Sequence, residues 1–247
     1  MKSAEQINPR LLDLWTTSDE YRRIYQTQDE VETIVRLMEM PGAAALVDIG
    51  CGNGAFAIAC ARANAACRVW AFDALESAVT ECRARAGDLI RAGRFTAGVA
   101  WGERIPLADA SVDRVLCRSV LHHLADADAL YRGIARLLRP GGLLLLQAPC
   151  NYWPKRWGRV IGELYRVFDD SHPRQYHQPA DVIAGLNVAG LAMQSAACWP
   201  YPWEDLKPAE VEFIKRHGAE ARFQLSRGED GKWNCSLYWV RVLARRM

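Results

Sequence analysis

Between residues 44 and 149, short apolar runs alternate with stretches in which apolar residues recur every three or four positions. Short apolar runs bounded by turn residues are typical of buried strands, and the longer spacing is typical of helices with one buried face. The alternation therefore predicts βαβ units around a parallel sheet. We expect strands at residues 46–49, 68–72, 95–100, 112–117 and 143–146, and helices at 55–64, 76–90 and 126–139.

The flanks of this region have different patterns. Residues 15–38 are amphipathic and predict a helix, and residues 150–178 are aromatic and aperiodic, which indicates an inserted cap or lid. A further helix is expected at 179–190, and two last strands at 193–199 and 236–243. The stretch between these strands contains Pro200, Pro202 and Pro208, so we expect it to be irregular.

Composition and charge disfavour several function classes. The 247 residues are 50% hydrophobic and 24% charged, which is ordinary for a globular protein. The net charge of +2 provides no basic field that would favour nucleic acid or an anionic membrane. The longest apolar run, residues 55–61, is far shorter than the roughly 20 residues that span a bilayer. The polar first residues contain no signal-peptide core, so we expect a cytoplasmic protein.

Eight cysteines occur, and none forms a C-x-x-C pair. Without a secretory signal, they are expected to be reduced thiols at small core positions, with no metal site among them. They lie at positions 51, 60, 67, 82, 117, 150, 198 and 235.

A glycine-rich turn follows the first predicted strand, where residues 47–54 read Val-Asp-Ile-Gly-Cys-Gly-Asn-Gly. The three glycines let the backbone turn tightly and approach a ligand, and the helix behind them offers free N–H groups. Asp73 stands 19 residues after Gly54, at the end of the second predicted strand. A carboxylate there can accept both hydroxyl hydrogens of a ribose.

This pattern has three interpretations: a site for a dinucleotide, a site for another ligand with a ribose, or a tight turn without a ligand. The dinucleotide fingerprint G-x-G-x-x-G requires glycine at position 55, where this chain has Ala55. Asp48 is also unlike the hydrophobic strand end of dehydrogenases. The agreement of turn, helix and Asp73 in spacing favours a ligand over a turn alone.

Over residues 44–149 the chain resembles the class I S-adenosylmethionine-dependent methyltransferases, in particular their small-molecule, type 11-like group. An ordered set of motifs carries the resemblance: residues 47–54, Asp73, Ile105-Pro106-Leu107 with Asp109, residues 111–115, Leu121-His122-His123-Leu124 and Leu138-Arg139-Pro140-Gly141-Gly142. The resemblance implies a Rossmann-like α/β sheet of seven strands, mostly parallel with the last strand antiparallel, with N-terminal helices and a cap inserted after strand five. It implies one domain over residues 1–247, divided into an N-terminal helical lid (1–40), a cofactor-binding core (41–149), a cap insertion (150–178) and a C-terminal part of the sheet and substrate region (179–247).

The resemblance also implies S-adenosyl-L-methionine as cofactor, with S-adenosyl-L-homocysteine as product. The glycines would pass beneath the methionine part, Asp73 would hold the ribose, and Ala74 and Leu75 would flank the adenine. Where the family usually places an aspartate against the adenine amine, this chain has Trp101, which would either stack on the adenine or fill core. The implied cofactor-binding residues are Asp48, Gly50, Cys51, Gly52, Asn53, Gly54, Asp73, Ala74, Leu75, Trp101, Cys117 and Arg118, the last two through backbone carbonyls.

Methyl transfer from an activated sulfonium requires mainly alignment of the nucleophile and exclusion of water. A general base is needed only if the acceptor arrives protonated, so the sequence need contain no obligatory catalytic residue. His122 and His123, just after the fourth strand, are candidates for that base, although the pair also fits a role in packing or capping the next helix. His177, in the expected cap, is a third candidate.

Aromatic residues are frequent in the expected lid, cap and C-terminal stretch. Such surfaces suit a flat, largely apolar acceptor, or they pack the cap onto the sheet. The candidate substrate-binding residues are Tyr21, Tyr25, Tyr152, Trp153, Trp157, Tyr176 and Trp203.

We therefore expect a methyltransferase that acts on O, N or C of a small aromatic or lipophilic metabolite, without membrane partners, as a monomer or homodimer. Two alternatives stay open. An RNA methyltransferase would use a basic run of Lys155, Arg156, Arg159 and Arg166, although the near-neutral charge disfavours nucleic acid. A cofactor-binding regulatory protein without catalysis is the other alternative, because a fold alone does not certify a reaction.

Overall fold

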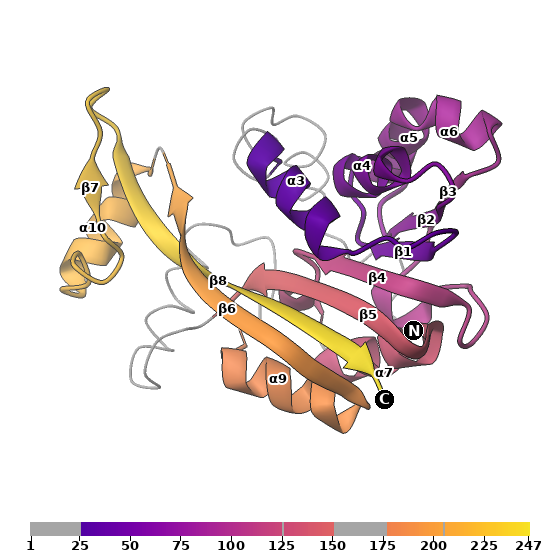
Figure 1. Cartoon of the computed structure of the whole chain (residues 1–247). Coiled ribbons are helices and arrows are strands. Elements are labelled where there is room, and N and C mark those ends of the chain that lie inside the picture. The colour runs from indigo at the N-terminus through magenta and orange to yellow at the C-terminus, as the bar shows by residue number, and fades with distance from the viewer. Residues whose placement is uncertain (1–25, 125, 151–176, 205) are drawn as a thin grey trace.

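The computed structural model of the chain describes residues 26–124, 126–150, 177–204 and 206–247, without the side chains of residues 202 and 203. Its centre is one twisted sheet with strand order β3-β2-β1-β4-β5-β8-β6 and the short β7 paired to β8 outside this path (Figure 1). The strands are β1 (Ala45–Ile49), β2 (Arg68–Asp73), β3 (Phe95–Val99), β4 (Val112–Arg118), β5 (Leu138–Pro149), β6 (Leu191–Trp203), β7 (Ser226–Arg227) and β8 (Trp233–Arg246).

Strands β1 to β5 run parallel to one another, and β8 runs antiparallel to both β5 and β6. The predicted seven-stranded, mostly parallel sheet with an antiparallel last strand is therefore confirmed. The expected strands at 193–199 and 236–243 are parts of longer strands, because β6 and β8 form an extended antiparallel ribbon beyond the sheet (Figure 1).

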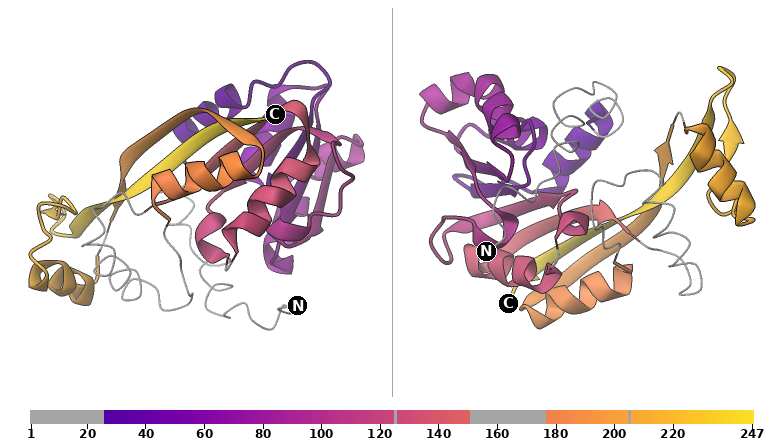
Figure 2. Two further views of the ribbon diagram at one scale, coloured as in Figure 1. Left: turned by 90° about the horizontal axis from the view of Figure 1, so that it is seen from below. Right: turned by 180° about the vertical axis from the view of Figure 1, so that it is seen from behind.

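Helices cover both faces of the sheet (Figure 2). One face carries α3 (Gln28–Leu37), α4 (Ala55–Ala63), α5 (Glu76–Arg85) and α6 (Gly87–Arg91), and the other carries α7 (Ala127–Leu137) and α9 (Pro179–Val188). Ile34 and Met38 of the α3 segment are fully buried beside Phe56 of α4, which confirms the apolar side expected for residues 15–38 where the structure describes them. Tyr131 and Ile134 of α7 pack with Leu186 of α9 in the opposite core layer.

The helices expected at 76–90 and 126–139 differ from the observed ones. The helix expected at 76–90 is two helices, because Ala86 leaves helical geometry just before Gly87, a residue that disfavours a helix interior. Helix α7 starts as predicted, with the Asp126 side chain accepting a hydrogen bond from the Ala129 N–H at 2.9 Å. It ends at Leu137, and residue 138 already pairs with β4, so Arg139 belongs to β5.

The prediction that the chain is irregular directly after residue 199 was wrong. Pro200 and Pro202 lie in β6, which pairs with β8 alone among the described strands. A proline at such an edge removes a donor that faces away from the sheet, so the strand tolerates it. Helix α10 (Pro208–Arg216) follows and packs at the far end of the ribbon (Figure 1), in a small separate core around Ile214, Phe223 and Leu237.

Candidate active site

The parallel strands bring the predicted cofactor residues to one edge of the sheet. Ile49, the last residue of β1, is in register with Phe72 of β2 on one side and with Cys117 of β4 on the other. The glycine turn, Asp73 and the residues after Cys117 therefore follow three adjacent strands at their carboxyl ends. This is the edge at which ligands bind in open α/β sheets.

Residues 50–54 form a tight turn that only glycine can make at two positions. The N–H groups of Gly50 and Cys51 both donate to the carbonyl oxygen of Phe72, at 2.8 and 3.0 Å. Gly50 has a φ of +72°, and a Cβ there would lie 2.1 Å from Cγ2 of Val120. Gly54 has a φ of +80°, and a Cβ there would lie 2.5 Å from Sγ of Cys82. Glycine is therefore required at these positions by the backbone conformation and by close packing against Val120 and Cys82.

Asp73 ties the glycine turn to the end of β2. Its carboxylate accepts hydrogen bonds from the N–H of Gly52 at 2.9 Å and from the N–H of Leu75 at 3.0 Å. Burial raises the pKa of Asp73, and the backbone donors, including that of Ala74, oppose the shift. Because a carboxylate offers about four acceptor positions, these backbone donors leave acceptor capacity for a ribose hydroxyl.

Asp48 lies beneath the turn in β1 and is 2% exposed. Burial, followed by repulsion from Asp73, raises the pKa of Asp48 to about 8, although Arg118 lowers it. Asp48 is therefore mainly protonated at neutral pH in the protein without ligand, and a bound cation would favour its ionised form.

Asn53 and Cys51, the two non-glycine residues of the turn, connect it to neighbouring segments. The Asn53 side chain exchanges two hydrogen bonds with the amide of Gln26, at 3.1 and 3.2 Å, and accepts a third from the N–H of Ala55 at 3.2 Å. The buried Cys51 thiol is hydrogen-bonded to Cys82, and this bond and burial raise its pKa. A thiol in this state is unreactive, so Cys51 serves packing. All eight cysteines are free, and all but Cys198 are buried, which confirms their predicted core role.

Trp101 lies beside Asp73 at the same edge. The preceding residue, Ala100, donates its N–H to the carbonyl oxygen of Asp73 at 2.9 Å. Trp101 then begins the turn η2 (Gly102–Arg104), and its side chain is partly buried. Leu75, at the start of α5, is buried and Ala74 is partly exposed.

Strand β4 ends in an unusual conformation that the sequence does not reveal. Ser119 has a φ of +57°, which is rare outside glycine, and its N–H donates to the carbonyl oxygen of Gln147 at 2.8 Å. Such outliers cluster at functional sites, where the surrounding structure stabilises them. The strained residue directly follows Cys117 and Arg118, the pair predicted to line the site.

A partly buried polar network next to Arg118 was not predicted from the sequence. Glu30 of α3 accepts hydrogen bonds from Gln147 at 2.5 Å and from Arg241 at 3.0 and 3.2 Å. Arg241 also donates through Nε to Gln147 at 3.1 Å, and its guanidinium lies 4.8 Å from the Trp199 ring centre. The only local signal is a polar residue, Gln147, at the end of an apolar strand.

The three candidate bases occupy two places. His122 and His123 form the turn η3 (Leu121–His123) just after β4, with ring centres 3.9 Å apart, and His122 is buried. His177 lies two residues before the start of α9 and faces Asp128 and Asp181. Burial lowers the pKa of His177 more than these carboxylates raise it, so its ring is neutral at pH 7.

Most of the predicted substrate-binding aromatics, Tyr21, Tyr25, Tyr152, Trp153, Trp157 and Tyr176, lie outside the described residues. Trp203 lies in β6 at the far end of the ribbon, and its side chain is outside the description. Among the described aromatics, Tyr201 and Trp239 pack together with ring centres 4.9 Å apart, close to Arg118.

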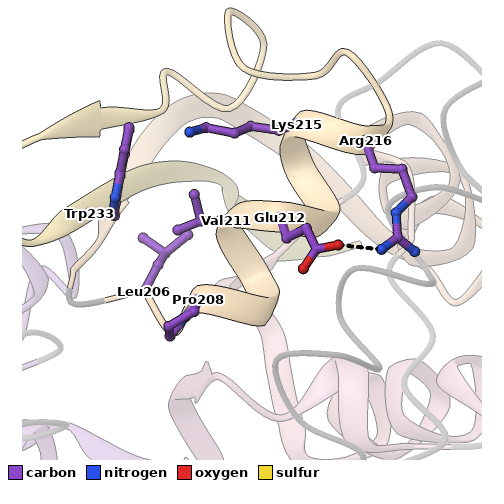
Figure 3. A pocket seen from close by; sticks show the side chains of 7 residues that line it. All are labelled: Leu206, Pro208, Val211, Glu212, Lys215, Arg216 and Trp233. Carbon is purple, nitrogen blue, oxygen red and sulfur yellow. Dashed lines mark hydrogen bonds and ion pairs between the residues drawn. The ribbon is translucent and has the colours of Figure 1, made fainter.

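A separate pocket of about 470 Å³ lies between α10 and Trp233 (Figure 3). Lys215 reaches over the Trp233 ring at 4.4 Å, and Arg216 pairs with Glu212 at 2.6 Å. The pocket belongs to the small core at the end of the ribbon and shares no lining residue with the glycine turn, so we do not assign the cofactor to it.

Within the described part of the chain, every helix is too short or too polar to cross a membrane.

Comparisons with known proteins agree with this geometry. The profile of a methyltransferase domain matches residues 47–146. The ubiquinone biosynthesis O-methyltransferase of Xanthomonas campestris pv. campestris (strain B100) is 30% identical over 182 residues, which cover 71% of this chain and 74% of the relative. The crystal structure of the YcgJ protein from Bacillus subtilis superposes with a TM-score of 0.76 at 20% identity, over 89% of this chain and 99% of that chain.

A further solved structure contains the product of the cofactor. Geranyl diphosphate C-methyltransferase from Streptomyces coelicolor A3(2), solved with Mg²⁺, geranyl diphosphate and S-adenosyl-L-homocysteine, superposes with a TM-score of 0.67. It is 17% identical, over 89% of this chain and 79% of that chain. The likeness at this identity shows a shared fold.

Proposed function

Because this chain belongs to the class I S-adenosylmethionine-dependent methyltransferases, we propose that it methylates a hydroxyl oxygen of a small aromatic metabolite. S-adenosylmethionine is its cofactor. The observation that carries the choice of oxygen is the 30% identity to an O-methyltransferase over 71% of the chain. We further propose that the chain is one cytoplasmic domain, a monomer or homodimer, with residues 1–40 as lid and 150–178 as cap.

The edge of the sheet supports a distribution of roles around the cofactor. Residues 50–54 would lie beneath its methionine part, Asp73 would hold the ribose, and Leu75 and Trp101 would flank the adenine. When bound, the cofactor supplies a sulfonium methyl that is already activated for displacement. The protein then has to orient the acceptor oxygen in line with the methyl group and exclude water.

A phenolic acceptor must also lose its proton. A neutral histidine near the acceptor can accept it, and His122, His123 and His177 are the candidates. Single replacements by glutamine separate them: loss of the acidic limb of the pH profile of kcat/KM identifies the base. If none of the three replacements changes the profile, the acceptor oxygen loses its proton without a histidine.

The decisive experiment supplies S-adenosylmethionine labelled with carbon-13 in its methyl group, together with a panel of catechols, phenols, amines and bulk RNA. The proposal predicts label on a phenolic oxygen with the wild type and none with Asp73→Ala. Label on nitrogen, carbon or RNA would replace this proposal by one of the alternatives. Tight binding of S-adenosylhomocysteine without transfer to any acceptor would favour a regulatory protein.

A further inference from the structure

Arg118 is a buried cation with unused hydrogen-bond donors. Its side chain is 6% exposed at the end of β4. Among the described residues, neither its Nε nor its Nη2 has a hydrogen-bond partner, although both atoms are buried. These two nitrogens form one edge of the guanidinium, and their parallel N–H groups match the two oxygens of a carboxylate.

The neighbouring charges do not neutralise this cation. Glu30 forms an ion pair with Arg118, with its Oε1 3.8 Å from the Arg118 Nε, which is beyond hydrogen-bond distance. Its oxygens already accept from Arg241 and Gln147, so one carboxylate serves two arginines. Asp48 also faces Arg118, but its pKa of about 8 keeps it largely protonated at neutral pH. Counted over Arg118, Arg241, Glu30 and Asp48, all within the described part of the chain, the cluster therefore carries an excess of positive charge.

Two aromatic rings fix the plane of the guanidinium. The Arg118 Cζ lies 4.7 Å from the Phe56 ring centre and 5.0 Å from the Trp239 ring centre. Contacts of a cation with ring faces leave its edges as the direction in which hydrogen bonds can form. Phe56 belongs to the first turn of α4, directly behind the glycine turn, so the unused edge belongs to the region of the candidate active site.

We propose that Arg118 binds a carboxylate in this site through its Nε and Nη2. Leaving the N–H groups of a buried cation without hydrogen-bond acceptors is unfavourable, and a ligand carboxylate would offset that cost. Two sources can supply this carboxylate: the methionine part of the cofactor, or an acid group on the aromatic acceptor. Both follow from the proposed function, so the inference rests on it. In the first case Arg118 positions the methyl donor, and in the second it selects acidic acceptors.

Binding measured by calorimetry distinguishes the two sources. S-adenosylhomocysteine is compared with 5′-methylthioadenosine, which keeps the adenosine and the thioether but lacks the amino acid. With S-adenosylhomocysteine saturating, 3,4-dihydroxybenzoate is compared with its uncharged methyl ester. The first variant is Arg118→Met, which keeps a long side chain and removes the charge. The second is Arg118→Lys, which keeps the charge and removes the two parallel N–H groups of the guanidinium. Arg62→Met, an exposed arginine of α4 that pairs with Asp88 at 3.5 Å, is the matched control.

Arg118→Met should weaken binding of one carboxylate probe by at least tenfold and leave its uncharged counterpart within twofold, with Arg118→Lys in between. A loss for S-adenosylhomocysteine alone identifies the cofactor as the source, and a loss for the benzoate alone identifies the acceptor. The proposal is overturned if charged and uncharged probes respond equally in both variants. It is equally overturned if both variants bind every probe like the Arg62→Met control, since Arg118 would then merely accompany Glu30. Failure of the proposed function would instead appear as absent methyl transfer, which these binding comparisons do not use.

Discussion

The carboxylate of Asp73 accepts a hydrogen bond from the Gly52 N–H at 2.9 Å, although the two residues are 21 positions apart in the chain. One oxygen of Asp73 thus holds the middle of the glycine turn, and the other accepts from the Leu75 N–H, which starts the next helix. The residue that we propose to bind the ribose therefore also shapes the turn that we propose to bind the methionine part. Cofactor affinity should depend on both functions together.

Replacement of Asp73 by alanine should lower the affinity for S-adenosylhomocysteine roughly 100-fold, because two hydrogen bonds to a charged acceptor contribute about 3 kcal/mol. Asp73→Asn keeps one acceptor oxygen and should lose roughly tenfold. Calorimetric titration measures both values. Asp88→Ala, an exposed aspartate of α6, is the control and should bind like the wild type. Unchanged affinity in Asp73→Ala would exclude the ribose role.

Replacement of Gly50 by alanine should destabilise the fold more than the same change at Gly93. Both residues have nearly equal φ, +72° and +70°. A Cβ at Gly50 would collide with Val120, whereas none of the described atoms lies within 4 Å of a Cβ at Gly93. Left-handed strain costs about 1–2 kcal/mol at either site, and overpacking adds about 1–3 kcal/mol at Gly50. Urea unfolding of both variants measures the difference, and equal losses would mean that Val120 moves aside.

The central part of the fold could be predicted because its signals are local. The glycine turn, the apolar strands and the Asp126 cap each depend on residues a few positions apart, and the structure confirms those elements. Only part of the ribbon was predicted, because the expected strands at 193–199 and 236–243 are shorter than β6 and β8. Pro200 and Pro202 indicate a turn in isolation, and only the pairing with β8 reveals that they occupy an edge strand.

The polar network of the site could not be predicted because it joins distant parts of the chain. Glu30 is 117 positions from Gln147 and 211 positions from Arg241. Each of these residues is unremarkable in its own segment, and no spacing rule connects a helix near the start of the chain with its last strand. Arg118 was predicted to line the site through its backbone, whereas the burial of its guanidinium became visible only in three dimensions.

Asp48 should make the stability of the cofactor-free protein decrease with rising pH. The pKa of Asp48 is about 8 in the fold, against an ordinary value of 3.8, so the folded state binds one proton more than the unfolded state between these values. The free energy of unfolding should therefore fall by up to about 1.4 kcal/mol per pH unit across this window and level off above pH 8. Asp48→Asn should remove the contribution of Asp48 and so make this slope shallower in urea unfolding at pH 5, 6, 7 and 8.

Asp113→Asn is the matched control for that pH series. The pKa of Asp113 is lowered by the Ala45 N–H and by Arg139, so this carboxylate is ionised in both states above pH 5. Its replacement should change stability by a constant amount from pH 5 to pH 8 and leave the slope intact. If Asp48→Asn and Asp113→Asn gave parallel curves, Asp48 would be ionised in the fold.

Trp101 should contribute to cofactor binding as an adenine-stacking residue. The bond from the Ala100 N–H to the Asp73 carbonyl places it next to the proposed ribose site. Aromatic stacking contributes about 0.5–1.5 kcal/mol, so Trp101→Ala should weaken S-adenosylhomocysteine and 5′-methylthioadenosine alike by about 3–10-fold. Trp233→Ala, at the pocket of α10 far along the ribbon, should leave both affinities unchanged. If Trp101→Ala instead bound both ligands normally but unfolded at lower urea concentration, the indole would fill core, and the adenine would depend on Ala74 and Leu75.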